Sequence, residues 1–119
     1  MKPVLDTSAL GQLFGAGHTF NKFSDQPVSE QTIRELYEQL KWGPTSMNAQ
    51  PGRYVFLSSA AARERLIPAM IAANAEKTRK APLTVIVAMD TQFYDHLPTQ
   101  FKAYDARPIF ADNPPLAEA

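Results

Sequence analysis

The stretch WGPTSMNAQP, residues 42–51, gathers small hydrogen-bonding side chains and contains no charged group. Thr45 and Ser46 carry hydroxyl groups, and Asn48 and Gln50 carry amides that both donate and accept hydrogen bonds. This set of groups suits a polar, largely neutral ligand. Because the same residue types form turns, the alternative is that they only satisfy the backbone of their own loop.

The elements on either side must position this loop. Ser29 is a predicted N-cap, and the apolar residues that follow it at helical spacing predict a helix that ends at Gly43 and Pro44. Residues 54–58, YVFLS, form a β-type run. The loop therefore joins a helix to a strand, and we expect its polar groups at the edge of a sheet, where cofactors commonly bind.

The rest of the chain alternates helical and strand patterns. We expect a short helix over residues 5–14 and a helix after Ser59 that Pro68 breaks or kinks. Residues 83–89 are nearly all apolar, which predicts a strand buried on both faces. This order of elements predicts a mixed α/β (α+β) fold, with a sheet flanked by helices.

The last third is less regular. Aromatic residues and prolines alternate between Phe93 and Phe110, which indicates a long, partly helical segment that acts as a packed lid or as ordinary core. Asn113 and Pro114 then have the types of a helix N-cap and a first helical residue. Because this helix start and the two buried-type strands need further partners, we expect residues 1–119 to be a single domain that is incomplete at its C-terminal end.

Composition excludes several classes of protein. Twelve basic residues balance twelve acidic ones, which argues against nucleic-acid or anionic-membrane partners. The absence of cysteine excludes disulfides and thiolate chemistry, and two histidines far apart make a poor metal set. No apolar run approaches the ~20 residues that span a bilayer, so we expect a cytoplasmic protein. Neither a nucleophile-elbow serine nor a glycine-rich dinucleotide fingerprint is present.

Longer segments carry a family resemblance. In their order and spacing, GHTFNKF, WGPTSMNAQPGRYVF and AANAEKTRKAPLTVIVA resemble the FMN-dependent nitroreductase superfamily. Within it, LKWGPTSMNAQPGRYVF, KTRKAPLTVIVAMDTQFYDHLP and DARPIF are most similar to the malonic semialdehyde reductases and their NAD(P)H nitroreductase-like relatives. The likeness covers essentially the whole chain.

The resemblance implies a homodimer with one FMN at each of two subunit interfaces. Residues matching Pro44, Thr45, Ser46 and Asn48 would approach the flavin from the neighbouring subunit. The residue matching Asn74 would hydrogen-bond the edge of the isoalloxazine ring; the alternative is a surface amide in a frayed helix.

GHTFNKF, residues 17–23, departs from the family pattern. Relatives usually carry arginines ahead of a serine or threonine and another basic residue two positions after it, whereas this chain has His18, Thr19 and Asn21. Thr19 can still bind the flavin phosphate and Asn21 the ring, while His18 is charged only in part at neutral pH. Lys22 is a candidate to compensate for the lost charge, and the alternative is that His18 and Asn21 only cap the first helix.

The resemblance also implies a ping-pong reaction. NADH or NADPH would reduce FMN and leave, and a small aldehyde such as malonic semialdehyde, or a nitro compound or quinone, would then be reduced in the same pocket. No catalytic side chain of the protein is required. The alternative function is a non-catalytic fragment or interaction module without bound flavin, and we expect activity to require a longer chain.

Overall fold

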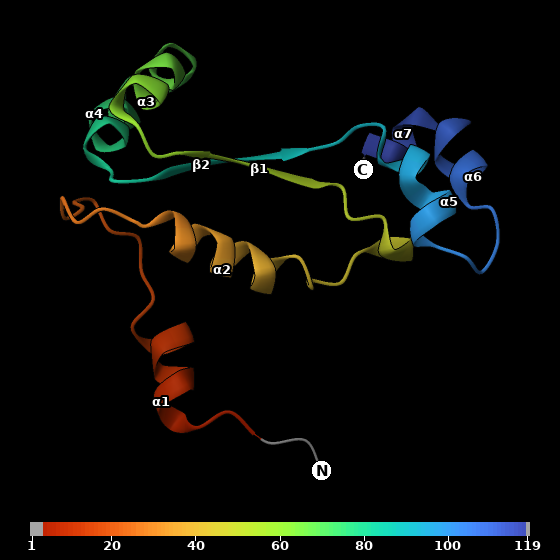
Figure 1. The fold of residues 1–119 in the computed structure, drawn as a ribbon, viewed down its shortest axis with the longest axis horizontal. Coiled ribbons are helices and arrows are strands. Elements are labelled where there is room, and N and C mark those ends of the chain that lie inside the picture. Colours follow the sequence, from red (N-terminus) through yellow and green to blue (C-terminus); the bar gives the residue numbers. More distant parts are fainter. Residues whose placement is uncertain (1–3, 119) are drawn as a thin grey trace.

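The computed structural model describes residues 4–118, in which short helices surround one two-stranded antiparallel sheet (Figure 1). Along the chain, α2 (Glu30–Leu40) precedes β1 (Gly52–Leu57), and α3 (Ala60–Leu66) and α4 (Ala72–Lys80) lead from β1 to β2 (Thr84–Met89). The other α-helices are α1 (Thr7–Leu10), α5 (Leu97–Gln100), α6 (Arg107–Ala111) and α7 (Pro114–Glu118). The predicted mixed class is confirmed, and the antiparallel pairing makes it α+β.

Local capping signals explain where the helices begin. Ser29 Oγ accepts a hydrogen bond from the Thr32 N–H at 3.0 Å, so the predicted N-cap of α2 is confirmed. Ser59 caps α3 in the same way. Asp6 caps α1, so this helix begins at Thr7, two residues later than predicted, and continues into a π-helical turn.

Several element ends differ by one to three residues from the predictions. α2 ends at Leu40, before Gly43, because the next N–H groups, of Trp42 and Gly43, bond to the carbonyl oxygens three residues back, as in turns. β1 begins at Gly52, two residues before the predicted run, because its pairing with β2 extends to the end of that strand. The predicted break at Pro68 is confirmed, since a 3₁₀ turn containing it separates α3 from α4.

The expectation that β2 is buried on both faces is wrong for the described residues. β2 pairs only with β1, with Gly52 opposite Met89 and Leu57 opposite Thr84. Val85 and Val87 share one face of the strand and are 37% and 71% exposed. An apolar run indicates which side chains avoid water, but it does not say how many neighbouring elements cover them.

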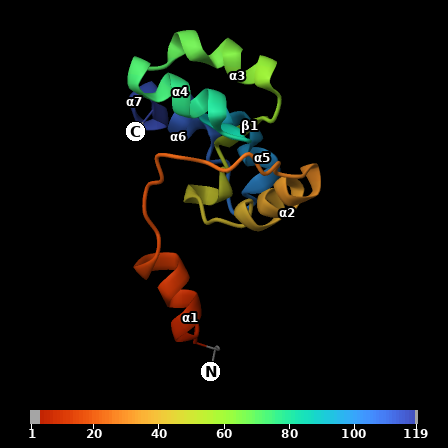
Figure 2. The ribbon, with the colours of Figure 1, turned by 90° about the vertical axis from the view of Figure 1, so that its left-hand side faces the viewer.

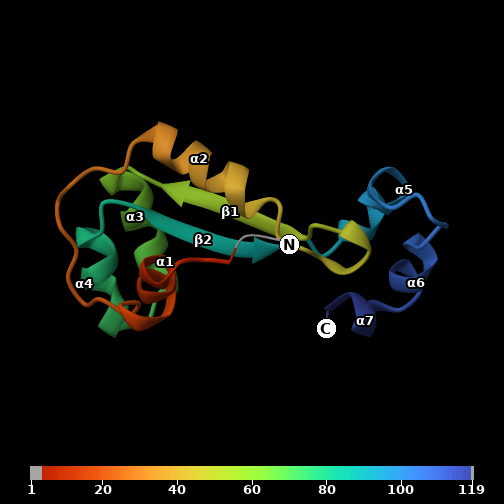
Figure 3. The ribbon, with the colours of Figure 1, turned by 90° about the horizontal axis from the view of Figure 1, so that it is seen from below.

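The arrangement in space is open. α3 and α4 lie at one end of the sheet, α5 to α7 lie at the other, and α2 runs beside β1 (Figures 1 and 3). α1 projects away from the rest of the chain (Figure 2). The radius of gyration is 18.5 Å, whereas a compact domain of this length has about 13.5 Å. Large apolar side chains such as Phe14 and Val87 are exposed as a consequence.

The best-packed region, which we call the C-terminal lobe, comprises residues 93–117. Phe93 and Phe110 meet edge to face with their ring centroids 5.0 Å apart, and Leu97 is 1% exposed. The aromatic segment is thus partly helical, as predicted, and its buried rings form core. Ala49, from the polar loop before β1, is buried in the same cluster. The lobe therefore packs against Ala49 of the 42–51 loop, whose polar side chains are the predicted ligand-binding groups.

Candidate functional site

A cavity of about 390 Å³ lies where the 17–23 segment approaches α4 and β2. We call it the Asn74 pocket. Its polar lining includes Thr19, Asn74 and Lys77, and its apolar lining includes Phe20 and Phe23. The size lies within the range of ligand sites, which are mostly apolar with a few placed polar groups. The structure thus brings Thr19 and Asn74 together, although 55 positions separate them in the sequence.

The geometry of α4 explains why Asn74 and Lys77 share this pocket. The pocket is lined by Asn74, Lys77 and Thr78, which share one face of α4 at i, i+3, i+4 spacing, and by Ala81, which caps the end of the helix. Thr78 and Ala81 are 7% and 6% exposed, so they anchor this face against the rest of the chain. Asn74 and Lys77, on the same face, are consequently held facing the pocket.

Lys77 brings a positive charge to the pocket. Its Nζ donates a hydrogen bond of 2.7 Å to Asn21 Oδ1, and within residues 4–118 it forms no ion pair. The next cations on α4 differ, because Arg79 pairs with Glu64 and Lys80 with Glu76. An ammonium group has three N–H donors, so Lys77 retains donors for an anionic or carbonyl oxygen.

Sequence reasoning missed Lys77 and considered Lys22 as the compensating cation. The structure places Lys77 beside Asn21, which therefore lies at the edge of the Asn74 pocket. The available signal was the three-residue spacing from Asn74, which puts both side chains on one helix face. His18 does not line this pocket. Its Nδ1 lies 2.9 Å from the Ala16 carbonyl oxygen, and its ring centroid lies 4.0 Å from that of Phe20.

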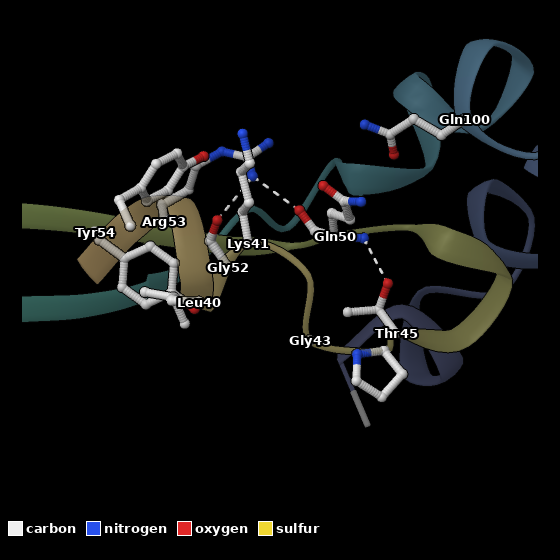
Figure 4. A pocket seen from close by; sticks show the side chains of 11 residues that line it. Leu40, Lys41, Gly43, Thr45, Gln50, Gly52, Arg53, Tyr54 and Gln100 are labelled. Atoms are coloured by element: carbon white, nitrogen blue, oxygen red, sulfur yellow. Dashed lines mark hydrogen bonds between the residues drawn. The ribbon is translucent and has the colours of Figure 1, made fainter. Parts of the chain in front are cut away.

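A second cavity of about 390 Å³, the Thr45 pocket, lies between the end of α2 and the start of β1. Figure 4 shows its side chains, which include Thr45, Gln50, Arg53 and Gln100. Thr45 Oγ1 accepts a hydrogen bond of 3.0 Å from the Gln50 N–H, and Pro44 also lines the cavity. Two of the predicted loop residues, Pro44 and Thr45, thus line a cavity together.

The other two predicted loop residues, Ser46 and Asn48, do not line the Thr45 pocket. They begin and end a 3₁₀ turn, and Asn48 Nδ2 donates instead to the Gln100 carbonyl oxygen at 3.2 Å. Asn48 Oδ1 accepts from Gln50 Nε2 at 2.9 Å. The Asn48 amide therefore already has protein partners on both of its polar atoms.

The loop backbone is held in an uncommon conformation. Met47, Asn48 and Gln50 have φ angles of 51°, 52° and 46°, in the left-handed region that non-glycine residues rarely adopt. Each such residue costs on the order of 1–3 kcal/mol, which the surrounding contacts must offset. Strain of this kind concentrates at functional sites, so the backbone gives a second reason to regard residues 44–50 as a binding loop.

Charged groups fix the junction between this loop and the sheet. The Arg53 guanidinium donates to Asp90 Oδ2 at 2.6 Å and to the Gln50 and Gly52 carbonyl oxygens at 3.0 Å each. The pKa of Asp90 is lowered, first by the hydrogen bond from the Gln92 N–H and also by Arg53. His96 Nε2 lies 3.5 Å from the same carboxylate. The start of β1 and the end of β2 are therefore tied together beside the Thr45 pocket.

The two pockets lie at opposite ends of the sheet. Thr84 lines the Asn74 pocket, whereas Gly52 lines the Thr45 pocket and pairs with Met89. The five residue-to-residue steps from Thr84 to Met89 span about 17 Å. Thr19 and Asn74 therefore do not meet Pro44 and Thr45 within one copy of the chain.

Between residues 4 and 118, no three His, Asp or Glu side chains come together as metal ligands. No helix in this range is long and apolar enough to cross a membrane.

Comparisons with known proteins identify the family and agree with the fold. Residues 18–112 match the model of the nitroreductase family. A protein of Ralstonia nicotianae with the name "Putative NADH dehydrogenase/NAD(P)H nitroreductase" is 50% identical to this chain over 109 residues. The aligned part is 92% of this chain and 56% of the relative, so the chain spans about half the length of that protein.

Proposed function

The chain belongs to the nitroreductase family, and on this premise we propose that the protein is an NAD(P)H oxidoreductase that binds FMN. The observation that carries the proposal is the Asn74 pocket, which brings Thr19, Asn74 and Lys77 together from two distant segments. Asn21 lies at its edge through its bond to Lys77.

The residues of the Asn74 pocket fit a flavin mononucleotide. A flavin ring needs apolar contacts for its faces and hydrogen bonds at its polar edge, and Phe20, Phe23 and Asn74 are of these types. The phosphate needs donors and positive charge, which Thr19 and Lys77 supply. His18 is adjacent to Thr19 in the sequence but does not line the pocket.

We also propose that the site is completed by a second copy of the chain in a homodimer. The separation of the two pockets supports this, because the 44–48 loop and the Asn74 pocket of one chain lie at opposite ends of the sheet. The loop of one subunit would supply Pro44, Thr45, Ser46 and Asn48 to the flavin held by its neighbour. The exposed apolar side chains of β2 and α1 supply surface for such an interface.

Bound FMN would supply the hydride chemistry, with NADH or NADPH as reductant and a second substrate as acceptor. The protein's own residues then act by binding and orientation. Asn74 and Lys77 would hold the polar groups of the cofactor, and the neutral loop would pack beside its ring without adding charge. The proposed acceptors are a small aldehyde such as malonic semialdehyde, nitro compounds or quinones.

An absorbance and titration experiment tests this function. The complete protein should carry FMN or take it up, quench its fluorescence on binding, and be reduced by NADH or NADPH without oxygen. The bound FMN should then be reoxidised by one of the proposed acceptors. A folded protein that neither contains nor binds FMN would contradict the proposal and favour the alternative, a non-catalytic interaction module.

A further inference from the structure

Gln100, the last residue of α5, contacts the strained loop from a position 52 residues away in the sequence. Its carbonyl oxygen accepts a hydrogen bond of 3.2 Å from Asn48 Nδ2. Its side chain lines the Thr45 pocket together with Thr45 and Gln50 (Figure 4). Gln100 thus contacts the loop through both its backbone and its side chain.

The Gln100 side chain has an orientation set by its neighbours. The carbonyl oxygens of Asn48 and Ala49 lie next to the same end of its amide, and carbonyl oxygens only accept hydrogen bonds. We therefore assign the amide nitrogen to this end, where it donates to both oxygens at 3.1 Å. Together with the backbone contact, Gln100 makes three hydrogen bonds to two consecutive loop residues.

These contacts lie at the residues of the loop whose backbone is strained. Asn48 is one of the left-handed residues, and Ala49 lies between it and Gln50, which is left-handed as well. Ala49 is also 4% exposed in the core cluster of the C-terminal lobe, which contains Leu97 from the same short helix as Gln100. The loop and α5 are therefore packed against each other in this cluster.

We propose that Gln100 is a positioning residue for the FMN site. It holds the backbone of left-handed Asn48 and right-handed Ala49 and so presents Pro44 to Asn48 in one fixed conformation. Gln100 acts through the loop and needs no contact with the flavin. This inference rests on the proposed function, since it assigns the loop to the cofactor site.

Hydrogen–deuterium exchange of the complete, flavin-free protein tests the positioning role directly. The Asn48, Ala49 and Gln50 N–H groups donate to Thr45 O, Ser46 O and Thr45 Oγ1. In Gln100→Glu, which keeps the size but loses the N–H donors, these amides should exchange about 5- to 150-fold faster. Gln39→Ala, at an exposed position of α2, is the control and should leave them unchanged. Exchange at the parental rate in Gln100→Glu and in Gln100→Ala would overturn the inference.

A pH series separates positioning from general destabilisation. A protonated carboxylic acid regains an O–H donor, so the loop protection and FMN affinity lost in Gln100→Glu should recover as the pH falls toward the ordinary glutamate pKa of about 4.3, with exchange rates corrected for the intrinsic rate at each pH. Gln100→Ala has no proton to gain and should not recover. FMN affinity equal to that of the parent in both variants would also overturn the inference. If the parent binds no FMN, the proposed function fails, while the exchange rates still decide whether Gln100 holds the loop.

Discussion

Lys77 Nζ and Asn21 Oδ1 lie 2.7 Å apart, although 56 positions separate the two residues in the sequence. This bond ties the 17–23 segment to α4 and places a positive charge between them. The segment contains no arginine, and its own cation Lys22 is exposed. The positive charge of the candidate site is therefore supplied by Lys77 of α4, which follows the 17–23 segment much later in the chain.

Replacing Lys77 should weaken FMN binding. Lys77→Met keeps most of the side-chain length and removes the charged donor, at a cost of about 1–3 kcal/mol for hydrogen bonds to a charged group, or roughly 5- to 150-fold in affinity. Fluorescence titration of the apoprotein with FMN measures this. Lys80→Met is the matched control, because Lys80 lies on the same helix in an exposed pair with Glu76. Equal losses in both variants would argue against a specific role for Lys77.

Asn74→Ala should lower the affinity for riboflavin as well as for FMN, because Asn74 is assigned to the ring edge and not to the phosphate. The expected loss is again roughly 5- to 150-fold, from about 1–3 kcal/mol for one buried polar contact. Parallel titrations with the two flavins provide the measurement. A variant that loses FMN affinity but binds riboflavin like the parent would move Asn74 to the phosphate end.

Asn48→Ala should weaken FMN binding through the loop. Asn48 bonds to both Gln100 and Gln50, so its removal releases two contacts that hold the left-handed backbone. We expect a loss of roughly 5- to 150-fold in FMN affinity, from about 1–3 kcal/mol, measured in the same titration. If the Asn48→Ala and Asn74→Ala variants both titrate like the parent, the assignment of these residues to the cofactor is wrong.

Features governed by neighbours in sequence were predicted well. The caps at Ser29 and Ser59, the break at Pro68 and the start of α7 at Pro114 each depend on one or two residues and their immediate backbone. The membership of Thr19 and Asn74 in one pocket followed from the family resemblance, because no local pattern relates positions so far apart.

Features governed by distant contacts were not predicted. Lys77 reaches Asn21, and Gln100 reaches the loop, through folding that brings separate segments together. The left-handed conformation of Met47 could not be predicted from the sequence either. Methionine has no preference for it, and only the surrounding packing enforces it. The exposure of Val87 depends on how many elements cover the sheet, which its apolar character does not specify.

Asp90 should contribute to stability except in acid. Its folded-state pKa is lowered, chiefly by the hydrogen bond from Gln92 and also by Arg53. Its contribution is therefore present above the ordinary aspartate pKa of about 3.9 and is lost as the pH falls through the lowered folded value. Urea unfolding at several pH values should show Asp90→Asn less stable than the parent at pH 7, with the difference shrinking below about pH 4. Asp25→Asn, in an exposed loop, should behave like the parent throughout.

Val87→Thr should destabilise the complete protein if a second subunit covers β2. Val87 is 71% exposed here, and Val85 and Met89 lie on the same face at 37% and 46% exposure, so the strand presents an apolar row. A threonine keeps the β-branched shape but would bury a hydroxyl without a partner, at a cost of about 1–3 kcal/mol. A truly exposed position would change the free energy of unfolding by less than about 0.5 kcal/mol.

Urea unfolding and sedimentation equilibrium of the parent, Val87→Thr and the apolar control Val87→Ile distinguish these cases. We expect a dimer that Val87→Thr weakens and Val87→Ile preserves; a monomeric parent, indifferent to both changes, would contradict the proposed two-subunit site.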